Sequence, residues 1–509
     1  MRKLIFLNIL LCCLSIHAQK DQRPNILFAI ADDWGRDAHI YGNQVISVPN
    51  FEKVAESGVY FTNAYVAAPT CTASRAGILT GRCPSSLEKG ANLFGTLDAK
   101  YDVYPDLLEK GGYQVAFTGK GWGPGSLEES GRTRNPSGDA YNDKKLDSPS
   151  GISDIDYSGN FKAFMKSRDK SKPFCFWYGA YEPHRSYQKG IGEHIGKINV
   201  CDIEVPGFYP DRMEIKEDLA DYYYEVNWFD KHLGEIIEYL KESGEYENTI
   251  FVVTGDHGMP FPRGKGGLYQ AGINAPLAIA WPKGIKVTGR EISDFVSLRD
   301  MFATFLDVAG ISVPKGVASK SIIPLLMSEK SGRIDNTRNH VYAMRERHAA
   351  SREDNVGYPV RAIVTDTFLY LRNFEPERSP HGDLLLGNHD GPLTDTDEGP
   401  TKFWLLEYRN HPTYSYYFNL AFAKRPEEEL YMVKKDPFQL NNLAGLGEYQ
   451  KVMAIFRKQL KESMKAHDDS RYTNENVLFD TYKYALPSAT PIAPKDLEKW
   501  YYSNMYPGK

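Results

Sequence analysis

Cysteine, long apolar runs and excess positive charge are all scarce in this chain. Six cysteines in 509 residues are too few for a disulfide scaffold, and their spacing matches no zinc-binding pattern. Beyond the N-terminus no segment approaches the length of about 18 apolar residues that a membrane span needs. Acidic residues outnumber basic ones by 66 to 61, which argues against a protein that coats nucleic acid. What remains is the composition of an ordinary globular protein with room for one large and one smaller domain.

The first residues, 1–19, are typical of a secretory signal peptide. Two cations, Arg2 and Lys3, precede a short apolar run that ends near Ala18. Removal of the signal peptide takes away these two cations and lowers the number of basic residues from 61 to 59, so the mature chain would carry a net charge of −7. We therefore expect a secreted or periplasmic protein. A polyanionic partner would need positive charge gathered in one pocket. The four remaining cysteines allow one or two disulfides.

Short apolar segments alternate with helical ones over the first half of the chain. An amphipathic helix is predicted at 216–243, where apolar residues recur at steps of three and four. A strand is predicted at 59–66, and a Gly/Asp/Pro-rich loop at 381–400. The predicted buried strands are 25–30, 113–118, 173–181 and 248–254. This alternation predicts an α/β fold with a mainly parallel central sheet flanked by helices.

Ionisable side chains follow each of these strands. They are Asp32 with Asp33, Lys120, His184, and Asp256 with His257. Because the carboxyl ends of parallel strands meet at one edge of an open sheet, we expect these groups to converge there.

A polar stretch at 328–340 indicates a domain boundary. Residues 20–340 are predicted to form an N-terminal catalytic domain. Residues 341–509 are predicted to form a smaller C-terminal α+β subdomain, with an antiparallel sheet, a helix near 447–466 and an irregular tail.

The most informative motif begins just before Cys71. Residues 69–75 read Pro-Thr-Cys-Thr-Ala-Ser-Arg, and Leu-Thr-Gly follows at 79–81. The motif resembles the signature of the type I sulfatases, Cys-x-(Pro/Ala)-Ser-Arg, with Ala73 where proline is commoner. The alternative reading is a buried cysteine before a helix. The resemblance covers about residues 22–465 and implies the alkaline-phosphatase-like fold, with a mixed, mainly parallel sheet.

The resemblance also implies that a maturation enzyme oxidises Cys71 to formylglycine. A sulfate ester is anionic and repels anionic nucleophiles. A hydrated aldehyde carries two hydroxyl groups on one carbon, and one of them attacks sulfur to form a covalent sulfate ester. Deprotonation of the other hydroxyl then expels sulfate, a step that an unmodified serine or cysteine lacks.

A calcium site is implied by the same resemblance. Its ligands would be Asp32, Asp33, Asp256 and His257, where His257 replaces the commoner asparagine. Carboxylate oxygens suit one hard Ca²⁺ ion, which would withdraw charge from a sulfate oxygen during attack.

Four further residues resemble the family's sulfate-binding set. Lys120, Lys265 and the signature arginine Arg75 would neutralise sulfate oxygens. His184, in Tyr-Glu-Pro-His at 181–184, matches the second histidine of His-x-Pro-His and would protonate the leaving group or bind a sulfate oxygen.

The chain departs from the family at Trp122 and Tyr181. The family often has histidine at both positions. Their replacement removes two donors near the sulfur centre and leaves the release of sulfate to another base.

Within the family the chain looks most like the N-sulfoglucosamine sulfohydrolases. Gly-Met-Pro-Phe-Pro at 258–262 and Tyr-Pro-Val-Arg at 358–361 support this likeness. The implied substrate is a sulfated saccharide such as heparan sulfate, with an N- or O-sulfate group. Arg345, Arg347 and His348 are expected at the rim of the cleft, binding carboxylates or neighbouring sulfates, and a solvated charged turn is the alternative.

Two other functions fit part of the pattern. Phosphonate and phosphodiester hydrolases of the same superfamily can use the same formylglycine. A catalytically degenerate glycan-binding protein is the second, which Trp122 and Tyr181 favour and the intact Cys71 opposes.

Overall fold

The computed structural model describes residues 23–388, 391–473, 478–493 and 496–497. The predicted signal peptide lies outside these residues. Within them no helix combines the length and apolarity that crossing a bilayer requires. The four cysteines in this part of the chain are all free thiols, so no disulfide joins them.

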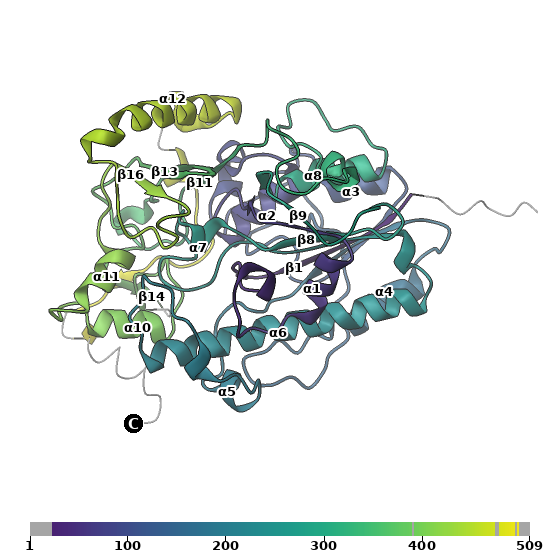
Figure 1. Ribbon diagram of the computed structural model, residues 1–509, viewed down its shortest axis with the longest axis horizontal. Helices are drawn as coiled ribbons and strands as arrows, with labels where there is room; N and C mark the ends of the chain where they lie inside the picture. Colours follow the sequence, from purple (N-terminus) through teal and green to yellow (C-terminus); the bar gives the residue numbers. More distant parts are fainter. Residues whose placement is uncertain (1–22, 389–390, 474–477, 494–495, 498–509) are drawn as a thin grey trace, which may run out of the picture.

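A central sheet with eight strands in the described residues organises the fold (Figure 1). Its strands, in spatial order, are β5 (Asp139–Ala140), β4 (Gln114–Gly119), β6 (Phe174–Gly179), β1 (Asn25–Ala31), β7 (Thr249–Gly255), β8 (Leu277–Ala280), β2 (Val59–Phe61) and β9 (Arg290–Ile292). The strands from β5 to β7 are parallel, and β8 runs antiparallel to both of its neighbours. The predicted mixed, mainly parallel sheet is confirmed.

Helices cover both faces of the central sheet, so the side chains of β1 are buried whichever face they point to. Ile26 and Phe28 join the core under α3 (Tyr104–Lys110) and α8 (Asp300–Val308), whereas Leu27 faces the core under α6. The long α6 (Met213–Glu242) runs along the lower side of the sheet in Figure 1, with α4 (Tyr157–Ser167) and α1 (Pro49–Glu56) packed against it. A strand buried on both faces needs a continuous apolar run, as the sequence indicates.

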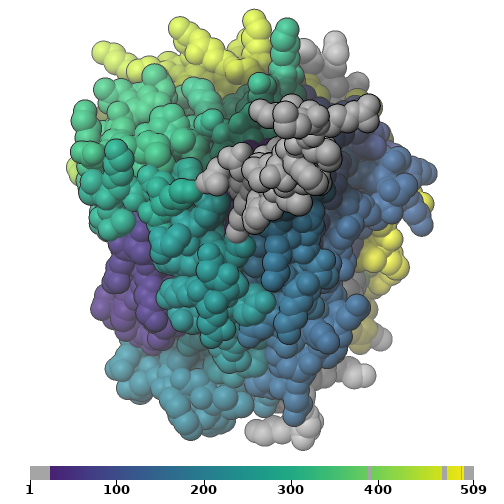
Figure 2. All heavy atoms as spheres, turned by 90° about the vertical axis from the view of Figure 1, so that its right-hand side faces the viewer, coloured from purple at the N-terminus to yellow at the C-terminus, as the bar shows by residue number. Residues whose placement is uncertain are grey.

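The C-terminal part adds a smaller antiparallel sheet, which lies at the upper left of Figure 1. Its strands are β11 (His340–Arg345), β12 (Val360–Thr365), β13 (Phe368–Asn373) and β16 (Glu428–Met432). Helix α12 (Gln450–Ala466) packs on β12, as predicted. Figure 2 shows the molecule from the right-hand side of Figure 1, where yellow C-terminal residues appear only at the margins.

Two segments differ from the expected structure. The predicted strand at 59–66 is split into β2 and β3 (Ala64–Tyr65), because β3 leaves the central sheet and pairs with β10 (Val296–Ser297). The Gly/Asp/Pro-rich loop at 381–400 contains β14 (Leu386–Asn388) and β15 (Gly391–Pro392), and β14 pairs with β17 (Thr490–Pro491). Such long-range pairing leaves no local pattern in the sequence.

Candidate active site

Cys71 is the first residue of helix α2 (Cys71–Thr80) and is almost completely buried. The helix begins directly after the loop that follows β3 and ends at Gly81, whose φ of 67° is a left-handed conformation that glycine adopts without strain. All ten residues of α2 are buried, so the core fixes the helix on every side. The first turn of α2 therefore holds Cys71 rigidly at the edge of the sheet.

Arg75, one turn further along α2, clamps three strand ends together. Its Nε donates to Asp256 Oδ2 at 2.7 Å, and Nη2 lies 3.4 Å from Asp32 Oδ1. Its Nη1 donates to the carbonyl oxygens of Lys120 and Gly121 at 2.8 and 2.9 Å. The guanidinium is fully buried and is absent from the described lining of the cavities beside Cys71. The sequence suggested direct contact with sulfate, but this geometry indicates that Arg75 positions the carboxylates.

Arg75→Met is expected to lower the free energy of unfolding by about 3–5 kcal/mol, because it leaves the buried Asp256 carboxylate without its basic partner and removes one of the two that Asp32 has. Chemical denaturation measures this loss. Lys100→Met is the control, since it breaks the Lys100–Glu88 pair, in which both side chains are half exposed, and should cost at most about 1 kcal/mol. Equal effects of the two substitutions would contradict the clamp.

Three carboxylates and a histidine surround Cys71. His257 Nε2 lies 3.0 Å from Asp33 Oδ1 and 3.7 Å from Asp256 Oδ1, and the Asp33 amide donates to Asp256 Oδ1 at 2.9 Å. One ligand atom each from Asp32, Cys71, Asp256 and His257 lies within 4.8 Å of the others. Asp33 itself adopts φ 69°, an uncommon conformation for a residue with a side chain. The cluster can hold a metal ion.

The charges of this cluster fit a divalent cation. Lys120 Nζ lies 2.5 Å from Asp32, and Lys265 Nζ lies 2.8 Å from both Asp33 and Asp397. Three buried carboxylates, with Asp256 included, and the partly buried Asp397 thus face three basic side chains, with Arg75 included. A divalent ion would leave one net positive charge, which suits an anionic ligand.

The same carboxylates shift the pKa of His257. Burial lowers its pKa, but Asp256 and Asp33 outweigh burial and raise the pKa well above the ordinary value. A metal ligand must be a neutral imidazole, so binding of a cation at this nitrogen would displace the proton.

Cys71 is a poor nucleophile as a thiol. Its Sγ lies 3.2 Å from His257 Nε2 and 3.9 Å from Asp33 Oδ1. Burial, followed by the nearby Asp32 carboxylate, raises the pKa of the thiol. Because the thiolate is the reactive form of cysteine, the unmodified residue does not suit nucleophilic attack.

A cavity of about 330 Å³ opens next to Cys71. Its lining residues are Cys71, Leu93, Phe94, Pro124, His184, Arg185, Ser186, Lys265, His348, Ala349, Thr394, Asp397, Glu398, Tyr484 and Leu486. We call it the catalytic cavity. His184 is about one third exposed, and its Nδ1 lies 2.5 Å from the Arg185 carbonyl oxygen. That bond assigns the proton to Nδ1 in the neutral ring and leaves Nε2, 3.9 Å from Asp33, to face the site.

Of the three residues predicted at the cleft rim, only His348 reaches the described lining of the catalytic cavity. Arg345 is buried, donates to the Gly266 carbonyl and pairs with Asp395. Arg347 is also buried and donates to the carbonyl oxygens of Asn355 and Tyr482. The two arginines differ from the expectation because Arg345, the last residue of β11, is bound to the loop that bears Lys265, and Arg347, beyond the strand, is bound to backbone carbonyls on both of its sides.

His348 is buried beside the residue that precedes Cys71. Its Nδ1 lies 2.8 Å from Thr70 Oγ1, next to Cys71. Burial lowers the pKa of His348 to about 3. It can therefore offer a neutral hydrogen bond to a ligand but no charge, contrary to the sequence interpretation.

Asp397 and Arg185 were missed from the sequence. Asp397 forms a second group with Asp33 and His184, with ligand atoms within 4.8 Å. Arg185 is held by Asp218 at 2.8 Å and lies over the ring of Phe261 at 4.5 Å. Arg185 could have been noticed because it follows His184, whereas Asp397 lies in a loop with no local signal.

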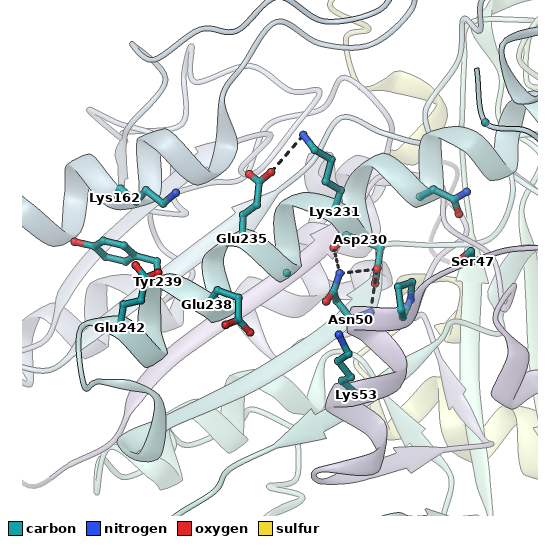
Figure 3. A pocket seen from close by; sticks show the side chains of 14 residues that line it. Ser47, Asn50, Lys53, Lys162, Asp230, Lys231, Glu235, Glu238, Tyr239 and Glu242 are labelled. Carbon is teal, nitrogen blue, oxygen red and sulfur yellow. Dashed lines mark hydrogen bonds and ion pairs between the residues drawn. The ribbon is translucent and has the colours of Figure 1, made fainter. Parts of the chain in front are cut away.

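A larger cavity lies elsewhere, between α1 and α6 (Figure 3). It measures about 810 Å³ and is lined by polar side chains such as Asn50, which donates to Asp230 at 3.0 Å, and Lys231, paired with Glu235 at 3.3 Å. None of its described lining residues belongs to the cluster around Cys71. Size alone therefore does not identify the reactive site.

Comparisons with known proteins agree with this geometry. The sulfatase family model matches residues 24–311, and the model described as N-sulphoglucosamine sulphohydrolase, C-terminal, matches residues 255–372. An ulvan-active sulfatase of Formosa agariphila is 26% identical over 500 residues, covering 90% of this chain and 78% of the relative. Human N-sulphoglucosamine sulphohydrolase is 26% identical over 489 residues, covering 88% and 91%.

The fold also has solved counterparts. A protein solved in complex with its substrate D-glucosamine-2-N,6-O-disulfate is 22% identical, with a TM-score of 0.61, and covers 89% of this chain and 100% of its own. The predicted likeness to the N-sulfoglucosamine sulfohydrolases is confirmed by the second family model. Because the first model matches more than half of the chain, the protein belongs to the sulfatase family and is a hydrolase of sulfuric esters.

Proposed function

We propose that this protein removes sulfate groups from a sulfated saccharide, of the glycosaminoglycan type exemplified by heparan sulfate. The nucleophile would be formylglycine made from Cys71 by a maturation enzyme, and Ca²⁺ would bind at Asp32, Asp33, Asp256 and His257. The carrying observation is the burial of Cys71 among carboxylates that are each matched by a basic side chain, at the floor of a cavity.

The contacts of each side chain in the site suggest its role in the reaction. Ca²⁺ would draw charge from a sulfate oxygen and help to orient the nucleophile. Were Asp33 bound to the ion, Lys265 would keep its pair with Asp397 and could donate to a sulfate oxygen, and Lys120 would do the same from the side of Asp32. Arg75 stays in its clamp and holds Asp32 and Asp256 in position.

His184 is the proposed acid. Its Nε2 faces the site, so the imidazolium form can protonate the departing oxygen or nitrogen. Trp122 and Tyr181 supply no imidazole, so His184 is also the candidate base for releasing sulfate from the covalent ester.

Three observations support a sulfated saccharide as substrate. The similar proteins are named for ulvan, N-sulphoglucosamine and D-glucosamine-2-N,6-O-disulfate. The catalytic cavity, at about 330 Å³, falls in the size range of small-ligand sites. Neutral His348 and the carboxylate of Asp397 on its wall suit sugar hydroxyl or amino groups, which both donate and accept hydrogen bonds.

The test is sulfate release by the formylglycine-containing enzyme from N-, 2-O-, 3-O- and 6-O-sulfated saccharides. Mass analysis of the peptide that contains Cys71 accompanies it. Release from at least one saccharide is expected. Turnover confined to phosphonate or phosphodiester substrates would replace the proposal by the superfamily alternative, and binding without turnover would favour a degenerate glycan-binding protein.

Lys265→Met is expected to lower kcat/KM by about 10²–10³-fold, because it removes a preorganised cation from the transition state. Steady-state sulfate release measures this effect. Lys283→Met, at an exposed position, is the control and should leave kcat/KM unchanged. A change of less than about threefold at Lys265 would argue against its contact with sulfate.

We further propose that residues 1–19 direct secretion or transfer to the periplasm, and that the chain divides into 20–340 and 341–509. The separate antiparallel sheet of β11, β12, β13 and β16 supports the second part as a unit. N-terminal sequencing of the exported protein tests the cleavage site.

A further inference from the structure

A second cavity opens beside the catalytic cavity, and the two share His184, Phe94 and Pro124. It measures about 570 Å³ and also reaches Asp32 and Lys120. Its remaining lining residues are Phe117, Gly119, Gly121, Trp122, Gly123, Gly125, Asn135, Asn142 and Tyr181. We call it the aromatic cavity. It borders the catalytic cluster through Asp32, Lys120 and His184, and Lys265 is absent from its described lining.

Aromatic side chains stand at both positions where the family often has histidine. The indole of Trp122 is buried and packs against Gly125, where an added Cβ would come within 2.4 Å of the ring. Tyr181 is 43% exposed, and its hydroxyl has no hydrogen-bond partner among the residues that the structure describes. Phe94 adopts φ 54°, a conformation that is costly for an aromatic residue and is found where a site requires it.

Hydrogen bonds fix the backbone of the wall that carries these rings. Asn135 accepts from the Trp122 amide at 3.1 Å and donates to the Trp122 carbonyl at 2.8 Å. Asn142 accepts from the Gly119 amide at 2.7 Å, and the Tyr157 hydroxyl accepts from the Tyr181 amide at 3.0 Å. The backbone on both sides of the aromatic cavity is therefore held in place without a ligand.

The charges distinguish the two cavities. Lys265 and Arg185 line the catalytic cavity, whereas the basic residues in the described lining of the aromatic cavity are Lys120 and His184, which belong to the catalytic cluster. Lys120 is paired with Asp32 and, in the proposed function, serves the sulfate group under attack. No cation is left in this lining for a second sulfate group, so the aromatic cavity suits the apolar face of a sugar ring.

We infer that the aromatic cavity is a second saccharide subsite, which binds the apolar face of the sugar ring next to the sulfated unit, with Tyr181 as the main contact. This inference rests on the proposed function. The apolar face of a pyranose ring packs on an aromatic ring, and the tyrosine hydroxyl reaches a sugar hydroxyl at the edge. The substrate is thus an oligosaccharide, and the sulfated unit is recognised together with its neighbour.

The test compares kcat/KM for a sulfated monosaccharide with that for a tetrasaccharide carrying the same sulfated unit. The wild-type enzyme should prefer the tetrasaccharide by about tenfold, and Tyr181→Ala should reduce this preference by about fivefold to tenfold, mainly through KM. Tyr181→Phe keeps the ring and should retain most of the preference. Tyr416→Ala, at a similarly exposed tyrosine in α11 (Ser415–Phe422), is the control and should leave it unchanged.

Each outcome is decisive. Equal kcat/KM for the two substrates, or an equal loss on both in Tyr181→Ala, would overturn the subsite while leaving the sulfatase function intact. Absence of release from either substrate, with turnover of a phosphonate ester, would overturn the proposed function and the subsite with it.

Discussion

Cys71→Ala is expected to reduce sulfate release by about 10⁴-fold or more, to the level of the uncatalysed background. The substitution removes the nucleophile and with it the route through a covalent sulfate ester. The side chain is small and the site is rigid, so the variant should fold. Steady-state release from the best saccharide of the panel measures the effect.

Cys201→Ala is the matched control, because Cys201 is an exposed free thiol outside the site. It should keep wild-type kcat/KM. Retention of more than about one hundredth of the activity in Cys71→Ala would show that Cys71 is not the nucleophile. So would an unmodified thiol in fully active wild-type protein.

Removal of the proposed Ca²⁺ ion is expected to have the second large effect. Chelation should lower turnover by at least about 10²-fold, since the ion would supply charge stabilisation that no described side chain of the site replaces. It should also lower the melting temperature, because an ion bound only by the folded state at 100 times its Kd stabilises that state by about 2.7 kcal/mol. Activity assays and thermal unfolding, each with and without chelator, measure the two effects.

A chelator already saturated with Ca²⁺ is the control for direct effects of the chelator. Restored Ca²⁺ should recover turnover, and Mg²⁺ should recover less, because it demands a smaller octahedral site. Metal analysis confirms that the ion has left. Full turnover by protein shown to contain no divalent ion would contradict the role given to the four ligands.

The sequence predicted the sheet and the groups at its edge because both depend on local pattern. The run 26–31 is apolar at every position, as a strand buried on two faces must be, and Asp32 and Asp33 follow it directly. The same reasoning placed Lys120, His184 and Asp256 at one edge. The structure brings all of these together around Cys71.

The loops beyond residue 340 were less predictable, because tertiary pairing decides them. Arg345 looked like an exposed cation but is neutralised by Asp395, 50 residues later in the chain. Asp397 approaches Lys265 over a separation of 132 residues. Neither partner leaves a trace near the residue it meets, so charge alone could not say which side chains face a ligand.

The enclosure of α2 has a consequence for how the active protein is made. Every residue from Cys71 to Thr80 is covered by its neighbours, and the thiol is 1% exposed. A second enzyme could not grasp this segment once the domain has closed. If Cys71 is converted to formylglycine as proposed, the conversion must therefore precede folding, and cells that fold the protein before oxidising the thiol would accumulate an intact but inactive product.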